Sequence, residues 1–166
     1  MRNKLIVAAL VLVGLASVAY AAFAQTLTIN GTSNVTGNWD VEIISITKTS
    51  GTGETDHAST PSFNATTATF NVDLAYPGAT ATYDVVMKNL GNINAEVSSI
   101  PDVTAINAAD PSDVKYTVSG VAVNDPLAPG DTVTSTVTVT WQGTANTNVT
   151  TASKTAVLNY GFAQNT

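Results

Sequence analysis

Short runs of alternating apolar and polar residues occupy most of this chain after residue 25. Each run is rich in Val, Ile, Thr and aromatic residues, and turn-forming Gly, Pro, Asn and Asp separate the runs. Alternation with a period of two is typical of strands that bury one face. The runs predict strands over residues 26–30, 39–48, 68–74, 80–89, 95–99, 114–118, 121–124, 132–141 and 156–162.

Helical periodicity is nearly absent from the chain. The stretch 105–112, which follows Pro101 and contains Pro111, is the one place where we expect a short turn of helix. Eight or nine short strands joined by polar turns indicate an all-β fold. We expect a single antiparallel β-sandwich of jelly-roll or immunoglobulin-like type.

Two of the longest runs repeat one pattern. "PGATATYDVVMKNLG" (residues 77–91) aligns without gaps on "PGDTVTSTVTVTWQG" (residues 129–143). Proline presets one torsion of a turn and glycine tolerates a positive φ, so each Pro-Gly pair predicts a tight turn into a strand. In the second run Val137 and Val139 share one face and five Thr residues line the other, which we expect to face solvent.

A hydrophobic leader precedes this region. Arg2 and Lys4 are followed by residues 5–18, where only Ser17 is polar, and then by the small residues around Ala21. A basic start, an apolar run and an A-x-A pattern are typical of a secretory signal, so we expect a signal peptide at 1–21. The alternative is a retained membrane helix, because residues 5–24 give about 20 residues of low polarity.

The segment behind the leader alternates like a strand. Phe23, Leu27 and Ile29 are separated by Ala and Thr, with Gln25 on the apolar side. An unpaired apolar strand invites association with another chain. We therefore expect an extended N-terminal strand and linker over residues 22–36, followed by the β-sandwich domain over residues 37–166.

Length, charge and cysteine content narrow the function classes. A chain of 166 residues favours one domain. The formal net charge is −6, and removal of Arg2 and Lys4 with the leader changes it from 6 − 12 to 4 − 12 = −8. An acidic surface repels phosphate backbones, so nucleic acid is not an expected partner. The chain has no cysteine, which excludes disulfides and thiolate metal sites.

One loop carries a possible metal site. His57 is the only histidine and lies in "SGTGETDHASTPS" with Glu54 and Asp56. One imidazole beside scattered carboxylates is a weak ligand signal, so we interpret these residues as a solvated loop. A Ser-His-Asp hydrolase would need the same His57, and the chain has no G-x-S-x-G motif. We assign no catalytic residue, no metal ligand and no cofactor.

Two pairs of carboxylates have the same interpretation. Asp40 and Glu42 share a face at the start of a predicted strand, where charge commonly faces water. Asp110 and Asp113 flank a Pro-Ser pair and could offer oxygen ligands to calcium, but no D-x-D-x-D-G loop surrounds them. Solvation is the favoured interpretation of both pairs.

Four Asn-x-Thr sequons follow the leader. They begin at Asn30, Asn34, Asn64 and Asn148, mostly near turn signals. In a chain this rich in Asn and Thr some sequons arise by chance. In a cell with an N-glycosylation pathway we expect some of the four to carry sugar.

Three segments carry a family resemblance. They are "AYAAFAQTLTINGTSNVTGNWDVEI", "YPGATATYDVVMKNLGNINAEV" and the closing strand pair. Together they resemble the TasA/camelysin-like family of secreted β-sandwich proteins, and within it the archaeal bundling-pilus subunits. The matching motifs are Ala22-Phe23 at the cleavage site, "GNWDV" at residues 37–41, and a Pro-Gly-led strand that ends in Asn89-x-Gly91.

The resemblance implies an extracellular filament built by donor-strand complementation. The N-terminal strand of one subunit would complete the sheet of the next, with Ala22, Phe23, Leu27 and Ile29 as the donor residues. The implied partners are identical subunits and neighbouring filaments in bundles, with no membrane span after cleavage. From the residues themselves we expect no enzymatic activity. Camelysins have been described as metallopeptidases, but this chain lacks H-E-x-x-H, so that activity is not carried over.

Two other functions stay open. A type IV pilin or archaellin-like subunit would retain residues 5–24 as a helix in the filament core, although no clear processing site precedes Leu5. A monomeric surface adhesin would bind carbohydrate through Trp39 or Trp141, although both lie beside predicted strands where a core or rim position is common.

Overall fold

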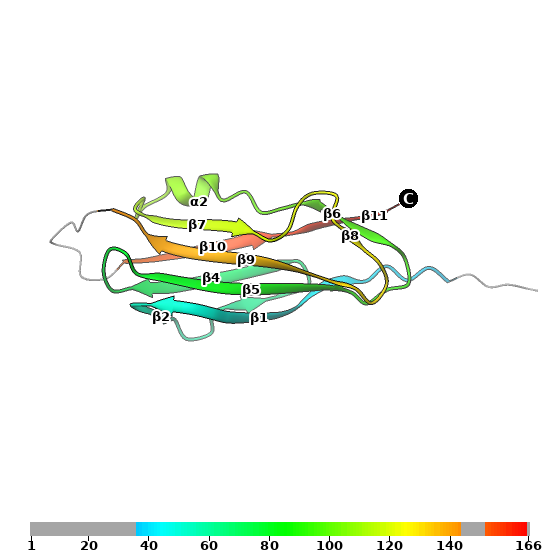
Figure 1. The fold of residues 1–166 in the computed structure, drawn as a ribbon, viewed down its shortest axis with the longest axis horizontal. Coiled ribbons are helices and arrows are strands. Elements are labelled where there is room, and N and C mark those ends of the chain that lie inside the picture. Colours follow the sequence, from blue (N-terminus) through cyan, green and yellow to red (C-terminus); the bar gives the residue numbers. More distant parts are fainter. Residues whose placement is uncertain (1–35, 144–151, 166) are drawn as a thin grey trace, which may run out of the picture. The chain divides into compact units, whose positions relative to one another are not determined.

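The structure is a computed structural model and describes residues 36–143 and 152–165 (Figure 1). The leader at 1–21 and the predicted strand at 26–30 lie outside these residues. The described chain is almost entirely antiparallel β-structure, which confirms the all-β prediction. Its one short helix is α2 (Thr104–Ala108), inside the stretch expected to hold a helical turn. No helix among these residues is both long enough and apolar enough to cross a membrane.

The strands form three sheets. The first has the order β1 (Val41–Thr52), β5 (Thr80–Asn89), β9 (Thr132–Trp141), β7 (Val114–Ser119). The second has the order β10 (Ala152–Asn159), β4 (Thr67–Leu74), β2 (Glu54–Asp56), and β3 (Ser62–Phe63) also pairs with β4. The third has the order β11 (Gly161–Gln164), β6 (Ala95–Ser99), β8 (Pro126–Leu127).

The first two sheets share one hydrophobic core. Alternate residues of β4, β5, β9 and β10 are buried, so each strand turns one face inward. The Phe70 ring from β4 meets the Tyr83 ring from β5 with their centroids 5.1 Å apart. The two sheets therefore have a sandwich-like arrangement around this core. Full burial of each large apolar side chain stabilises the fold by about 1.5–3 kcal/mol.

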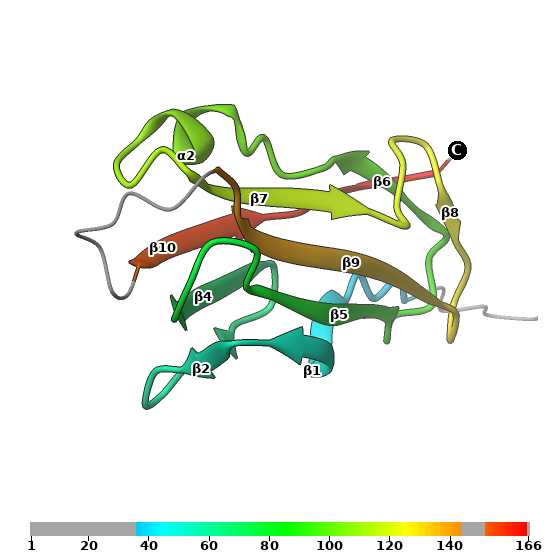
Figure 2. The same cartoon turned by 60° about the vertical axis from the view of Figure 1, so that its left-hand side comes forward.

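A second, smaller cluster lies under the third sheet. Val41, Ala95 and Leu127 are buried together, and Val133 and Phe162 pack against both this cluster and the main core. Figure 2 shows β6, β8 and the C-terminal strand gathered at the same end of the domain. The third sheet therefore extends the core at one end.

The two Pro-Gly turns have the predicted geometry. Gly78 has a φ of 93° and Gly130 a φ of 89°, and both turns close with a hydrogen bond from the residue after glycine. β5 and β9 begin two residues after these glycines and end where the pattern predicted. They are neighbours along almost their whole length. The Thr residues of β9 that alternate with its buried residues are half-buried or exposed.

The strand predicted at residues 121–124 is wrong. These residues form a turn in which Asn124 has a φ of 73°, a left-handed conformation that an extended strand does not contain. The strand comes later, as the two-residue β8. The sequence pattern also missed β2 and β3, which are three and two residues long and have no room for alternation.

The strand predicted at residues 156–162 is two strands. β10 begins earlier, at Ala152, and β11 begins at Gly161, so the chain changes partner strand at Tyr160. Tyr160 is buried and its hydroxyl lies 3.0 Å from the buried Ser135 Oγ on β9. This contact joins the strand to the opposite sheet at the point where it changes partner.

Helix α2 caps the outer edge of β7. Asn107 Nδ2 donates to the carbonyl oxygen of Tyr116 (2.8 Å), and the Tyr116 amide donates to Asn107 Oδ1 (2.7 Å). Lys115 Nζ donates to the Asn107 carbonyl at 2.7 Å. Unpaired backbone groups at a sheet edge are a template for another strand. A side-chain amide therefore occupies the place that a strand would take beside Tyr116.

The Asn107→Ala variant tests this cap. Loss of both amide contacts exposes the Tyr116 backbone to water, and we expect a loss of about 1–2 kcal/mol in unfolding free energy. Thermal unfolding should shift down by about 2–4 °C for each kcal/mol in a chain of this length. Asn107→Asp keeps the acceptor and loses the donor, so we expect an intermediate shift. Equal stability of all three proteins would contradict the cap.

Candidate functional site

The described chain begins in an extended segment that is tied to the turn between β5 and β6. Asn92 makes three contacts with this segment: its amide donates to the Asn38 carbonyl (3.0 Å), its Oδ1 accepts from the Asn38 amide (2.7 Å), and its Nδ2 donates to the Thr36 carbonyl (2.9 Å). The start of the described domain, from Thr36 to Asn38, is therefore fixed.

The same turn is held from inside by Asn89. Its side chain is buried, and Nδ2 donates to the carbonyls of Ile93 (2.8 Å) and Leu127 (2.9 Å), while Oδ1 accepts from the Gly91 amide (3.0 Å). A Cβ at Gly91 would overlap the Asn38 carbonyl oxygen. The Asn-x-Gly motif is thus explained by structure: Asn89 shapes the turn, and glycine allows the N-terminal segment to approach.

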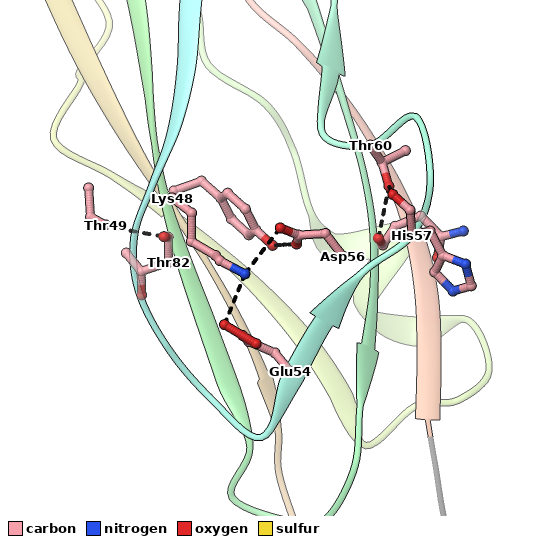
Figure 3. A network of polar contacts seen from close by, with 9 residues as sticks. Lys48, Thr49, Glu54, Asp56, His57, Thr60 and Thr82 are labelled. Atoms are coloured by element: carbon pink, nitrogen blue, oxygen red, sulfur yellow. Dashed lines mark hydrogen bonds and ion pairs between the residues drawn. The ribbon is translucent and has the colours of Figure 1, made fainter.

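A polar cluster lies at the far end of β1 (Figure 3). Lys48 Nζ lies 3.0 Å from Glu54 Oε1 and 3.1 Å from Asp56 Oδ2. The Tyr83 hydroxyl donates to the other oxygen of Asp56. The cluster joins β1, β2 and β5. The hydrogen bond to Glu54, with Asp56 beside it, raises the pKa of Lys48 above its usual value.

His57 does not join this cluster. Its Nε2 lies 2.8 Å from Asp73 Oδ1 on β4, and Figure 3 shows its side chain turned away from Lys48. Glu54 and Asp56 are two residues apart on β2 and both contact the lysine instead. Across residues 36–143 and 152–165, no three His, Asp or Glu side chains are grouped closely enough to hold a metal ion. The structure therefore does not bring Glu54, Asp56 and His57 together as a group of metal ligands.

The two tryptophans occupy different environments. Trp141 is 5% exposed and belongs to the main core, whereas Trp39 is 44% exposed in the N-terminal segment. The carbohydrate-platform hypothesis is therefore confined to Trp39. Leu90, in the turn that receives this segment, is also 44% exposed.

Of the four sequons, only the one at Asn64 lies among the described residues. Asn64 is exposed in the turn between β3 and β4, and its Oδ1 accepts from the amides of Thr66 and Thr67. These contacts involve the side-chain oxygen of Asn64. The atom that carries an N-glycan is Nδ2, and it belongs to an exposed residue. The sequons at Asn30, Asn34 and Asn148 lie outside the described residues. So do the donor residues Ala22, Phe23, Leu27 and Ile29.

Lys154 is a residue that the sequence reasoning missed. It takes an inward position on β10 and is 6% exposed, and its Nζ donates to the carbonyls of Ala109 (2.7 Å), Pro111 (3.0 Å) and Val114 (3.0 Å). Burial, with Lys115 nearby, lowers its pKa. The lysine ties the α2–β7 connection across to the second sheet. No local pattern around residue 154 signals this, because its partners are some 40 residues away in the chain.

Three buried tyrosines give the fold an alkaline limit. Burial raises the pKa of Tyr83, Tyr116 and Tyr160, and for Tyr83 the hydrogen bond to Asp56 raises it further. The folded state retains these protons while the unfolded chain loses them near pH 10. Stability is therefore constant with respect to these groups below about pH 10 and falls as the pH rises above it.

We expect these tyrosines to ionise only as the protein unfolds at alkaline pH. Ultraviolet absorbance of tyrosinate and circular dichroism should report one shared transition for them. In Tyr116→Phe the tyrosinate amplitude of that transition should fall, since one buried hydroxyl is missing. Ionisation of all three well before the loss of β-structure would contradict their burial.

Comparison of this chain with protein-family models, with characterised proteins and with solved structures finds no match. What the domain does is therefore inferred from its own residues, and above all from the fixed point at which the N-terminal segment leaves it.

Proposed function

We propose that this chain is a structural subunit of an extracellular filament that polymerises head to tail by donor-strand complementation. In this proposal residues 1–21 are a signal peptide, residues 22–36 form the donor strand and linker, and the described residues belong to a single β-sandwich. The observation that carries the proposal is the anchored start of the domain at Thr36. Asn92 fixes that start, and in this proposal the segment before it would be an arm tethered at that point.

The arm has the length and pattern of a donor strand. Residues 22–35, when extended at about 3.3 Å per residue, reach about 46 Å, far enough to cross to a neighbouring domain. Phe23, Leu27 and Ile29 lie on one side of this arm and Thr26 and Thr28 on the other. A strand added to a sheet gains affinity from backbone hydrogen bonds and specificity from alternate side chains.

Burial of the three apolar side chains stabilises the contact. At about 1.5–3 kcal/mol each, Phe23, Leu27 and Ile29 would contribute roughly 4.5–9 kcal/mol before ordering costs. A contact between an arm and a different surface of the next copy is heterologous and does not close on itself, so it produces an open polymer. Glycan at the exposed Asn64 would lie on the surface of such a filament.

Two alternatives make different predictions. A pilin-like subunit would retain residues 5–24, so its mature N-terminus would lie near Leu5 rather than near Ala22, which N-terminal sequencing distinguishes. A monomeric adhesin would bind carbohydrate through Trp39, the exposed tryptophan. Such a protein would keep its ligand after loss of residues 22–30 and lose it in Trp39→Ala.

The filament proposal is tested by a pair of charge substitutions in the arm. In Leu27→Asp an unpaired carboxylate would have to enter the neighbour's core, at a cost of about 3 kcal/mol or more. That corresponds to about a hundredfold loss of assembly. Thr28→Asp adds the same charge on the opposite side and should still assemble.

Electron microscopy and sedimentation of the secreted proteins measure the outcome. We expect filaments from the wild type and from Thr28→Asp, and a soluble monomer from Leu27→Asp. The absence of filaments from the wild type, or filaments of normal length from Leu27→Asp, would reject the proposal.

A further inference from the structure

The hydrogen-bond pattern of β4 shows which edge of β10 is paired. Thr67 directs its amide and its carbonyl to Asn64, away from β10, although it lies opposite Asn159. Asn159 and Thr67 are therefore a non-hydrogen-bonded pair. Because the two sides of a strand alternate, the amides and carbonyls of Asn159, Val157, Thr155 and Ser153 all face away from β4.

The third sheet shows which strand pairs on this side, away from β4, where the chain continues from β10 into β11. The Tyr160 amide donates to Thr66 on the β4 side (2.9 Å), whereas the Asn165 amide donates to Asn94 beside β6 (3.0 Å). Even and odd residues of a continuous strand point to opposite sides. β6 therefore lies on the edge that β10 leaves unpaired, and it ends where Ser99 meets Gly161.

A seven-residue edge consequently remains beside β10, in line with β6. Among residues 36–143 and 152–165, no strand pairs with it, and the segment that follows β6 leaves toward α2 instead. The side chains of Ser153, Thr155, Val157 and Asn159 along it are exposed, Val157 by 50%. We call residues 153–159 the β10 edge.

The other long edges of the described sheets are protected. On β7, Asn107 occupies both backbone groups of Tyr116, and Lys154 and Pro111 occupy those of Val114. β1 is interrupted by two irregularities in register, and its Ile43 amide donates to Ala65 at 2.6 Å. β8 has two residues, one of them a proline. Bulges, prolines and covering elements are the usual means of blocking an edge.

We infer that the β10 edge is the acceptor for residues 23–29 of a second copy of this chain. This inference rests on the proposed filament and identifies the surface that receives the arm. The edge and the arm are both seven residues long and neither carries a charge at an outward position. Continuity with β6 would let the added strand extend an existing row of hydrogen bonds.

The alternation of the two segments fits one arrangement. Outward positions on the β10 edge are Ser, Thr, Val and Asn, and cross-strand neighbours share a face. Thr26 and Thr28 of the arm then lie beside Thr155 and its outward neighbours. Phe23, Leu27 and Ile29 face inward with Ala156 and Leu158, which are buried in the main core.

Engineered disulfides test this pairing in the full-length chain, which has no cysteine of its own. Thr28→Cys is combined in turn with cysteine at each outward position of the β10 edge, at Ser153, Thr155, Val157 or Asn159. The control combines Thr28→Cys with Thr117→Cys, an exposed position on β7. After oxidation of filaments, we expect a ladder of linked subunits on non-reducing gels from at least one β10 pair and none from the control.

The outcomes separate the two proposals. Filaments that yield a ladder from β7, or from no β10 pair, would overturn the inference and leave the filament proposal standing. A wild-type protein without filaments would overturn the filament proposal itself. Linked species that form only at high monomer concentration, in the absence of filaments, would count against both.

A proline variant gives an independent readout. Thr155→Pro removes only an amide that faces away from β4, and proline is tolerated at such edge positions. The arm of this variant is intact, so it should dock on a wild-type subunit, but its own β10 edge should not accept the arm of another subunit. When a small fraction of the variant is mixed with wild-type protein, we expect the filaments to be severalfold shorter. Thr155→Val keeps the amide and should have no effect. Unchanged filament length with a folded Thr155→Pro protein would reject the β10 edge as acceptor.

Discussion

Backbone hydrogen bonding at the sheet edges is the constraint on which this structure depends. The described residues form eleven strands in three sheets, which have many edges, and every unpaired amide or carbonyl there either meets water or attracts another strand. The chain has no disulfide to hold those edges in place. Side chains contribute instead: Asn107, Lys154 and Asn89 each form hydrogen bonds with several backbone groups.

These three residues have complementary effects. Asn107 and Lys154 occupy backbone groups on the outer edge of β7, while Asn89 shapes the turn that anchors residues 36–38. In the proposed filament, the arm and the surface that receives it would be different parts of the chain, so copies of the chain would associate in one direction.

The sequence predicts those parts of the fold that depend on local pattern. β5, β6 and β9 have the predicted bounds, since Pro-Gly turns and alternation act within a few residues. β10 was predicted to begin too late because Lys154 interrupts the apolar alternation. Its buried ammonium group is stabilised because distant carbonyl oxygens accept hydrogen bonds from it. β2 was missed for a related reason, since Glu54 and Asp56 are stabilised by Lys48 from another strand.

The same distinction applies to the assembly surfaces. The alternation of Phe23, Leu27 and Ile29 is a local feature and can be identified in the sequence. The surface proposed to receive them cannot, because it is defined by the lack of a strand beside β10 among the described residues and by the distant groups that occupy the edges of β7 and β1. Charge reinforces the difference: without residues 1–21 the chain would carry a formal charge of 4 − 12 = −8, whereas residues 23–29 and the β10 edge are uncharged at the positions that would meet. Acidic domains repel one another over their surfaces, so association is favoured where backbone pairing and apolar burial act without that repulsion.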